Sequence, residues 1–264
     1  MKGQMMESDA LQKFLVRGKA AIVTGGGEGI GKATSLLLAT AGAAVAVLDK
    51  DGAKASAVAA QITGDGGVAA AYTVDVTGET AVEQAFADFA RSQGRLDILV
   101  NNAGIAIRGA AATLSIDDWN RVLGVNLTGM FLCARIAAGH MRQSGRGGAI
   151  VNTASIMGLS GGLYPNVAYQ TTKGGVVNMT RALALEWVGD GIRVNAVAPT
   201  YVNTPFIAGL ISNPETLAAI KAATPMGRLA EPEEIAAAIL FLASPAAAMI
   251  TGSILPVDGG FLAR

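Results

Sequence analysis

The sequence has very few of the side chains that hold metals or form nucleophilic triads. Its 264 residues include one cysteine, Cys133, and one histidine, His140. A single cysteine forms no internal disulfide, and with one cysteine and one histidine, His140, near a predicted helix end at the surface, we expect no zinc site, haem ligation or nucleophilic triad. We therefore expect no metal site. Cys133 lies in the apolar stretch MFLCARIA, where a buried, reduced thiol indicates a reducing compartment and a cytoplasmic location.

Charge is also scarce, and it is balanced. Lys plus Arg and Asp plus Glu each number 20, so we expect neither a nucleic acid nor a membrane as partner. The first residues lack the apolar core of a secretion signal, and we expect residues 1–17 to form a loose tail before a single domain over 18–264. The uncharged run 236–257 is broken by Pro245 and Pro256, which favours a buried helix and strand over a membrane span.

Apolar residues are abundant, at 51% of the chain, and they recur in short runs. The runs predict seven strands, at 20–24, 44–48, 68–74, 97–101, 148–153, 192–197 and 253–257. They are nearly continuously apolar, as is typical of parallel strands covered on both faces. Helix-length segments rich in Ala, Leu, Glu and Gln separate them. The pattern predicts an α/β fold, a doubly wound parallel sheet in one domain with helices on both faces.

A glycine-rich turn, TGGGEGIG, follows the first predicted strand. Gly25, Gly29 and Gly31 fall where a chain must turn tightly, approach a pyrophosphate and pack a helix against the sheet. The N-terminus of the next helix favours the phosphates. Asp49 ends the second predicted strand, where a carboxylate accepts hydrogen bonds from a ribose diol. This turn therefore predicts a dinucleotide site.

The acidic residues near this turn favour NAD as the cofactor. Asp49 and Glu28 would both repel the 2′-phosphate of NADP at short range. The nearby cations are Lys32 and Lys50, and Lys50 is the one that can weaken this discrimination.

Two further segments end predicted strands at the edge where open α/β sheets bind ligands. Asp75 and Val76 end the third strand and are placed to hold the adenine. In the NNAG segment, Asn101, Ala103 and Gly104 end the fourth strand, and the small residues let the backbone approach the cofactor. Such Asn-Gly clusters standing alone are ordinary turns.

Tyr169, Lys173 and Ser155 together predict a proton-transfer site. Tyr169 and Lys173 are four residues apart and share a helix face, although this spacing alone is common on protein surfaces. An adjacent ammonium and a positive nicotinamide ring lower the pKa of a tyrosine from about 10 toward neutrality. Ser155 is placed to donate a hydrogen bond to the substrate oxygen. Asn126, in an apolar segment, is placed to hold a water, and Tyr164 lacks a lysine four residues on.

From about Lys19 to Phe261 these motifs, in this order, resemble the short-chain dehydrogenase/reductase family. The matching segments are TGGGEGIG, Asp75-Val76, NNAG at 101–104, Asn126, Ser155, YQTTK at 169–173, IRVNAVAP at 192–199 and TGSILPVDGG at 251–260. The resemblance implies a seven-stranded Rossmann-type sheet and a homotetramer or homodimer built through long helices. It also implies hydride transfer between NAD and an alcohol or ketone.

Residue roles follow from the same resemblance. Tyr169 is the acid/base, Lys173 lowers its pKa and holds the ribose, Ser155 orients the substrate, and Asn126 anchors a proton relay. The assigned cofactor contacts also include Ile30, Pro199, Val202 and Thr204. Thr200 stands where the family usually has glycine, which narrows the pocket near the nicotinamide.

The substrate is predicted to touch segments 105–112 and 156–166 and a lid at about 200–225. The lid carries Tyr201, Asn203, Ser212, Asn213 and Glu215 but no arginine, and we expect Arg108 and Lys221 to be solvated. This mix favours a neutral polyol or sugar, and the lid and C-terminal end are similar to bacterial polyol dehydrogenases. A 3-oxoacyl-[acyl-carrier-protein] reductase is the alternative enzyme, which would need NADP and a basic docking patch. A non-catalytic nucleotide-sensing protein is the alternative from another class.

In two predicted helical segments, 117–143 and 166–188, apolar residues occur on several sides of the helix. One face of a sheet covers only part of them. These are Val122, Val125, Met130, Phe131, Cys133, Ile136, Val176, Met179, Leu183, Leu185 and Trp187. We expect the helices to pair across a two-fold axis, with the end after Gly260 making a second contact in a tetramer. The alternative is that the sheet and neighbouring helices bury them all.

Overall fold

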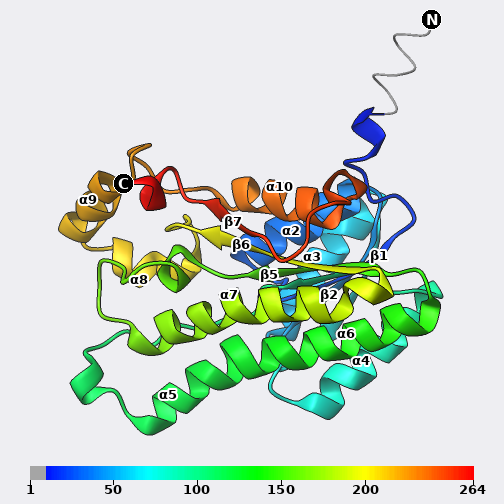
Figure 1. The fold of residues 1–264 in the computed structure, drawn as a ribbon, viewed down its shortest axis with the longest axis horizontal. Coiled ribbons are helices and arrows are strands. Elements are labelled where there is room, and N and C mark those ends of the chain that lie inside the picture. Colours follow the sequence, from blue (N-terminus) through cyan, green and yellow to red (C-terminus); the bar gives the residue numbers. More distant parts are fainter. Residues whose placement is uncertain (1–9) are drawn as a thin grey trace, which may run out of the picture.

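The computed structural model describes residues 10–264 and contains a seven-stranded parallel sheet (Figure 1). The strands lie in the order β3-β2-β1-β4-β5-β6-β7. Their bounds are β1 (Ala20–Thr24), β2 (Ala44–Asp49), β3 (Val68–Thr73), β4 (Ile98–Asn101), β5 (Gly148–Thr153), β6 (Ile192–Pro199) and β7 (Ile254–Val257). All seven predicted strands are confirmed. The strand order reverses between β1 and β4, the place where such sheets open a crevice for a ligand.

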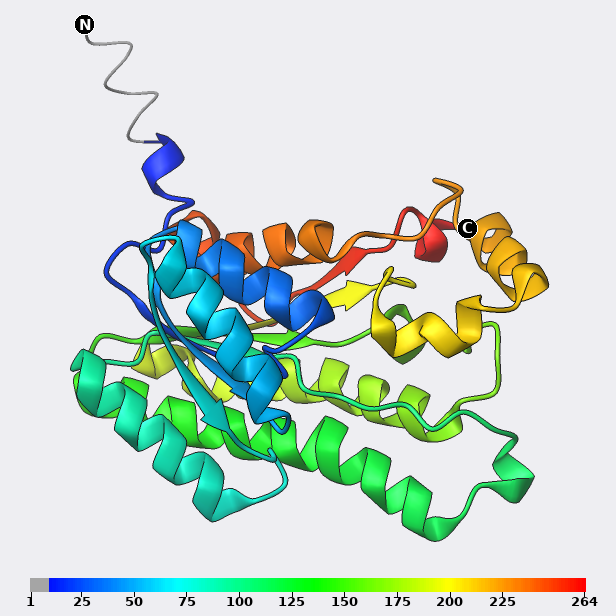
Figure 2. The same ribbon diagram turned by 180° about the vertical axis from the view of Figure 1, so that it is seen from behind.

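Helices cover both faces of the sheet, as predicted (Figures 1 and 2). One face is covered by α2 (Gly29–Thr40), α3 (Gly52–Gly64) and α10 (Pro232–Ala243). The other is covered by α4 (Glu79–Gln93), α5 (Ile116–Leu123), α6 (Met130–Ser144) and α7 (Val167–Trp187). Two short helices, α8 (Ala208–Ile211) and α9 (Pro214–Ala223), lie beyond the end of β6 and form the lid (Figure 2).

Burial of the strands follows their place in the sheet. The central strand β1 is buried along its whole length, because helices cover both of its faces. The edge strand β3 is half-exposed, and Val68 at its start is 57% exposed. The expectation that every strand is covered on both faces is therefore wrong for the two edge strands β3 and β7, whose side chains are half-buried or exposed.

The α5–α6 segment contains an irregularity that matters for the site. Ser115 caps α5 by accepting a hydrogen bond from the Asp118 amide at 3.0 Å. Between α5 and α6 lies a π-helical stretch, η2 (Gly124–Gly129), of a kind that is frequent at functional sites. Asn126 lies in this stretch and is completely buried.

One described helical run, Ile116–Ser144, is long and apolar enough to cross a membrane by length and composition alone. Its inner face packs against the sheet through Cys133 and Met141, as expected of a core helix. The uncharged run 236–257 forms the end of α10 and β7, as predicted.

The predicted N-terminal tail is only partly within the described residues, since residues 1–9 lie outside them. Part of the segment 10–17 contacts the domain. The Phe14 ring stacks on Phe241 of α10 at 6.2 Å, and buried Val16 donates its amide hydrogen to the Ala41 carbonyl at 3.0 Å. Val16 is therefore part of the domain, whereas Leu11 is 68% exposed, and a loose tail before these contacts stays a prediction.

Candidate active site

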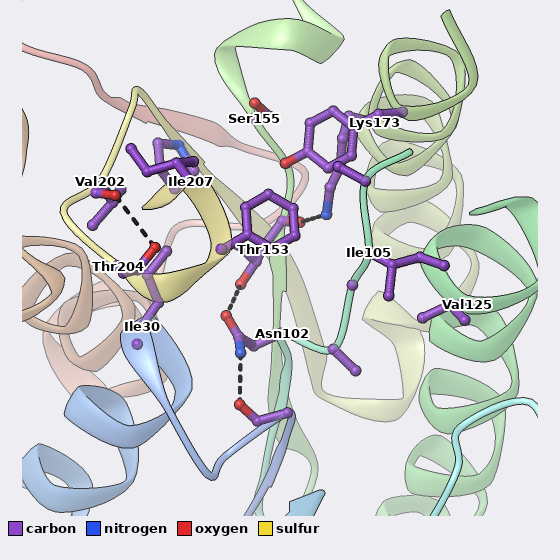
Figure 3. A pocket seen from close by; sticks show the side chains of 18 of the residues that line it. Ile30, Asn102, Ile105, Val125, Thr153, Ser155, Lys173, Val202, Thr204 and Ile207 are labelled. Carbon is purple, nitrogen blue, oxygen red and sulfur yellow. Dashed lines mark hydrogen bonds between the residues drawn. The ribbon is translucent and has the colours of Figure 1, made fainter. Parts of the chain in front are cut away.

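A cavity of about 950 Å³ opens at the carboxyl ends of the strands (Figure 3). Its size suits a dinucleotide with a small substrate. The predicted cofactor residues that line it are Gly25, Gly29, Ile30, Asp49, Asp75, Val76, Ala103, Gly104, Pro199, Val202 and Thr204. Ser155, Tyr169 and Lys173 line it as well. The fold thus gathers the two predicted sites into one cavity.

The glycine turn has the geometry that a dinucleotide requires. A Cβ on Gly31 would lie 1.9 Å from the Gly25 carbonyl oxygen, so only glycine lets α2 pack this closely on the turn. Gly25 and Gly29 have φ values of +60° and +53°, which favour glycine. Glu28 precedes α2 without capping it through its side chain. The first amides of α2 therefore remain suited to a phosphate, and the turn fits a dinucleotide.

Asp49 is held beside this turn. Its Oδ2 accepts a hydrogen bond from the Gly27 amide at 3.0 Å, and its Oδ1 accepts one from the Asp51 amide at 3.0 Å. Sequence reasoning missed a third residue here, Lys54, which lies one helical turn into α3. Lys54 pairs with Glu28 at 2.5 Å, and this ion pair raises the pKa of Lys54. The sequence contained one indication that Lys54 lies near this site, namely its position shortly after Asp49.

The end of β4 corrects one cofactor assignment. Asn101 is buried and does not line the cavity. Its Nδ2 donates instead to the Met130 carbonyl at 3.1 Å and to Asn152 Oδ1 at 3.0 Å. Successive side chains of a strand alternate in direction, so it is Asn102 that meets the cavity. Asn102 donates to the Gly25 carbonyl at 3.1 Å and accepts from the Thr153 hydroxyl at 3.4 Å (Figure 3). It ties the glycine turn to β5.

Lys173 lies beside Tyr169 on α7, as the four-residue spacing predicts. Its side chain is buried, and Nζ donates to the Thr153 carbonyl at 2.6 Å (Figure 3). Nζ lies 5.5 Å from the centroid of the Tyr169 ring. Ser155, after β5, accepts a hydrogen bond from the Met157 amide at 3.1 Å. This bond does not use the hydroxyl hydrogen of Ser155.

Burial dominates the electrostatics of this pair. Burial lowers the pKa of Lys173 to about 8. Burial also raises the pKa of Tyr169, although the Ser155 hydroxyl and the Arg108 guanidinium oppose this rise. In the protein alone, burial thus outweighs the expected lowering of the Tyr169 pKa. The added effect of a positive nicotinamide ring stays a prediction.

Asn126 lies behind the cavity wall and does not line it. Its Oδ1 accepts from the Ile105 amide at 2.8 Å, and its Nδ2 donates to the Ile105 carbonyl at 2.9 Å. Nδ2 also contacts the Thr172 hydroxyl at 3.2 Å. The side chain thus fixes the segment after β4 against α7. Its part in a proton relay stays a prediction.

The substrate end of the cavity receives residues from all three predicted segments. Most polar side chains of the lid are elsewhere, however. Asn203 contacts Glu231 at 3.3 Å, and Asn213 caps α9 by accepting from the Glu215 amide at 2.8 Å. Of the five polar lid residues singled out from the sequence, only Tyr201 lines the cavity. The lid residues that line it are Thr200, Tyr201, Val202, Thr204, Pro205, Phe206, Ile207 and Leu210.

Arg108 also lines the cavity, which corrects the expectation of a purely solvated side chain. Its guanidinium carbon lies 5.7 Å from the centroid of the Phe206 ring, and Nη2 donates to the Phe206 carbonyl at 3.5 Å. The Phe206 ring in turn lies 6.0 Å from the Tyr169 ring. The segment after β4 and the predicted lid therefore meet over Tyr169.

Known proteins are similar to this chain in both sequence and fold. Residues 25–262 match a family model described as enoyl-(acyl carrier protein) reductase. The chain is 43% identical to a galactitol 2-dehydrogenase of Rhizobium johnstonii, with 95% of this chain and 97% of the relative covered. It is 44% identical to a D-threitol dehydrogenase of Mycolicibacterium smegmatis, with 94% of each covered.

Solved structures agree with these relatives. A short-chain type dehydrogenase/reductase from Mycobacterium marinum has a TM-score of 0.93 at 36% identity, over 97% of this chain and 100% of that one. A gluconate 5-dehydrogenase from Burkholderia cenocepacia, in complex with NADP and tartrate, has a TM-score of 0.92 at 34% identity, over 97% and 99%. With the glycine turn and the Tyr169–Lys173 pair lining one cavity, the chain belongs to the short-chain dehydrogenase/reductase family of oxidoreductases.

Proposed function

We propose that this protein oxidises a secondary alcohol group of a polyol or sugar with NAD, and reduces the corresponding ketone with NADH. The observation that carries the proposal is the buried Lys173 beside Tyr169, in the same cavity as the glycine turn. Burial of an ammonium group costs free energy, and groups with displaced pKa values are concentrated at active sites.

Each residue has a definite part in the proposed reaction. Tyr169, as phenolate, accepts the proton of the substrate hydroxyl, and Ser155 Oγ donates a hydrogen bond to the same oxygen. Lys173 Nζ keeps the phenolate charged, while its bond to the Thr153 carbonyl fixes its direction. When bound, the nicotinamide cofactor accepts the hydride from the carbon. Asn126 holds the segment after β4, and a relay of protons past it to solvent is part of the proposal.

NAD is the proposed cofactor because of Asp49. Its carboxylate faces the glycine turn, where a ribose diol can donate to it. Glu28 adds a second negative charge, but its pairing with Lys54 offsets part of the repulsion of a 2′-phosphate. The related gluconate 5-dehydrogenase binds NADP, so a measurable residual use of NADP is expected here.

A polyol or sugar is the proposed substrate. The curated relatives named for galactitol and D-threitol support it. The 3-oxoacyl-[acyl-carrier-protein] reductase alternative needs basic side chains at the cavity mouth for an acidic carrier. Arg108 and Arg121 are the arginines that line the cavity, and the guanidinium of Arg108 is already engaged by Phe206.

One experiment tests the reaction class. The protein is mixed with NAD and a panel of polyols and secondary alcohols, and the absorbance of reduced nicotinamide is followed. We expect turnover of polyols, and Tyr169→Phe should lower kcat about 100-fold or more while NADH binding persists. If the variant keeps more than about a tenth of wild-type kcat, Tyr169 is not the acid/base, and Tyr164→Phe is the next variant to measure.

The proposal also includes a cytoplasmic homotetramer, with a homodimer as the smaller alternative. Burial raises the pKa of the Cys133 thiol to about 12, so this cysteine is unreactive and imposes no oxidising compartment. The apolar side chains exposed on the α5–α7 face support an assembly between copies of the chain.

A further inference from the structure

Three side-chain oxygens at the substrate end of the cavity have no hydrogen-bond partner. They are the hydroxyl oxygens of Thr200 and Tyr201 and Oδ1 of Asn166. All three residues line the cavity, and Thr200 and Tyr201 are only 9% and 8% exposed. Among the residues that the structure describes, five buried side-chain atoms lack a partner, and three of the five belong to residues that line this cavity. Buried polar groups are nearly always hydrogen-bonded, and such a gathering needs an explanation.

The Tyr201 side chain lies under the lid, close to the reacting groups. The apolar residues packed round it are Ile156, Met157, Ile207 and Leu210, together with Tyr164. Each of these also lines the cavity, as Tyr201 itself does. The Leu163 amide lies near the phenol oxygen but outside hydrogen-bond geometry.

The protonation of Tyr201 fits a neutral ligand. Burial raises the pKa of Tyr201 to about 12, and the other ionisable groups that face it are Tyr164, Arg108 and Tyr169. Tyr201 is therefore protonated near neutral pH, and its hydroxyl is a donor and an acceptor without charge.

Asn166 supplies an acceptor from the other side. It directly precedes α7, yet its side chain does not cap this helix. Its backbone pairs with that of Gly109 in the segment after β4, and this pairing fixes the backbone of Asn166 in space. Asn166 precedes Tyr169 by three residues. Its Oδ1 is thus available to a ligand.

These groups suit a hydroxyl group better than a carboxylate. The set contains two hydroxyls and an amide oxygen, and an amide oxygen only accepts hydrogen bonds. A carboxylate would face that oxygen without a partner and would lose hydration at a place where the nearest cation, Arg108, is already engaged by Phe206. A hydroxyl group donates to Asn166 and accepts from Tyr201 or Thr200.

We propose that Tyr201 and Thr200, with Asn166, form a subsite for the hydroxyl group adjacent to the carbon that is oxidised. The enzyme then selects vicinal diols over alcohols with one hydroxyl, because the mono-alcohol leaves the buried donors without a partner. This inference rests on the proposed alcohol oxidation and specifies its substrate class.

The test compares 2,3-butanediol with 2-butanol, which differ only in the adjacent hydroxyl. For Tyr201→Phe we expect kcat/KM for the diol to fall about 10- to 100-fold and that for 2-butanol to change less than about twofold. Thr200→Val should act in the same direction, and Thr200→Ser should restore the diol preference. Since Tyr201→Phe removes an unpaired buried oxygen, its melting temperature should be unchanged or higher.

Tyr164→Phe is the matched control, because the Tyr164 hydroxyl already contacts the Thr216 carbonyl at 3.4 Å. It should affect both alcohols alike. Equal losses for diol and mono-alcohol in Tyr201→Phe, or no loss for either, would overturn the subsite. Calorimetric titration of the NADH-loaded protein with the diol gives a second readout that needs no turnover, with weaker binding expected in Tyr201→Phe. If the wild type oxidises no alcohol, the proposed function fails, and this titration still decides the subsite.

Discussion

At the scale of single residues, the active site is built from groups held in unfavourable states. Lys173 is the clearest case. Its ammonium is buried, and the only hydrogen bond that its side chain makes within the described residues is to the Thr153 carbonyl. The fall of its pKa from 10.5 to about 8 corresponds to about 3 kcal/mol of unfavourable charge burial at neutral pH. Such a residue lowers stability in return for activity.

Replacing this charge should separate the two effects. Lys173→Met loses the Thr153 hydrogen bond, worth about 1 kcal/mol, so we expect a net gain of about 2 kcal/mol in the free energy of unfolding at pH 7, with activity abolished. Below pH 8 the lysine is protonated in both states and the penalty is fully present. Between about 8 and 10.5 the folded protein loses the proton first, so the advantage of the variant should shrink and vanish. Urea unfolding at pH 7 and above pH 10 measures this. A less stable variant at pH 7 would contradict it.

Asp49 carries the prediction on the cofactor. The wild type should have a higher kcat/KM for NAD than for NADP, and Asp49→Ser should shrink this ratio about tenfold or more, because the carboxylate no longer repels a 2′-phosphate. Lys54→Ala should change the ratio in the opposite direction, since it leaves Glu28 without its cation. Steady-state kinetics with both cofactors measure the ratios. Similar values of kcat/KM for the two cofactors in the wild type would refute the role given to Asp49.

At the scale of elements, the strands were readable from the sequence and several site contacts were not. Buried parallel strands produce continuous apolar runs, so all seven were found. Asn101 was misassigned because the motif does not tell which of two successive side chains points to the cavity. The structure shows that Asn102 does. Asn126 was recognised, but its hydrogen bonds to Ile105 depend on the π-helical stretch. The spacing of residues in the sequence does not predict such a stretch. Contacts between distant segments, such as Arg108 with Phe206, have no local signal at all.

That last contact links two elements over Tyr169 and should influence its titration. The groups that face Tyr169 are Ser155, Arg108, Lys173 and Tyr201. The Arg108 charge lowers the pKa of Tyr169. Its loss in Arg108→Gln should therefore move the pH at which alcohol oxidation is half-maximal upward, and lower kcat/KM at pH 7 about two- to fivefold, as for a solvent-screened charge.

Arg108→Lys is the matched control for this effect. It keeps the charge but loses the planar group that stacks on the Phe206 ring. The pH profile should therefore stay close to that of the wild type while KM rises through a looser lid. A profile in Arg108→Gln identical to the wild type would show that the guanidinium acts on the lid alone.

At the scale of the whole molecule, the surface over α5, α6 and α7 carries apolar side chains that a single chain leaves exposed. The sequence argument for it was partly wrong, because Val122, Met130, Cys133, Val176, Leu183 and Trp187 are buried within the chain by the sheet and neighbouring helices. Other apolar side chains remain outside. Ile116, Phe131, Leu185 and Val188 are 72%, 40%, 80% and 55% exposed. Exposed apolar groups of this size on one helical layer favour the proposal of a protein interface there.

Self-association through this layer is therefore the expected quaternary structure. Static light scattering at micromolar concentration should give a mass of two or four chains, and a mass near the 26.6 kDa of one chain would exclude a stable oligomer. Leu185→Arg should lower the mass, because a charge at the centre of an apolar interface has no partner there. Val68→Arg, on the exposed edge strand β3 away from this layer, should leave it unchanged. Equal effects of the two substitutions would mean that charge on any surface disrupts the assembly, and that α7 is not the interface.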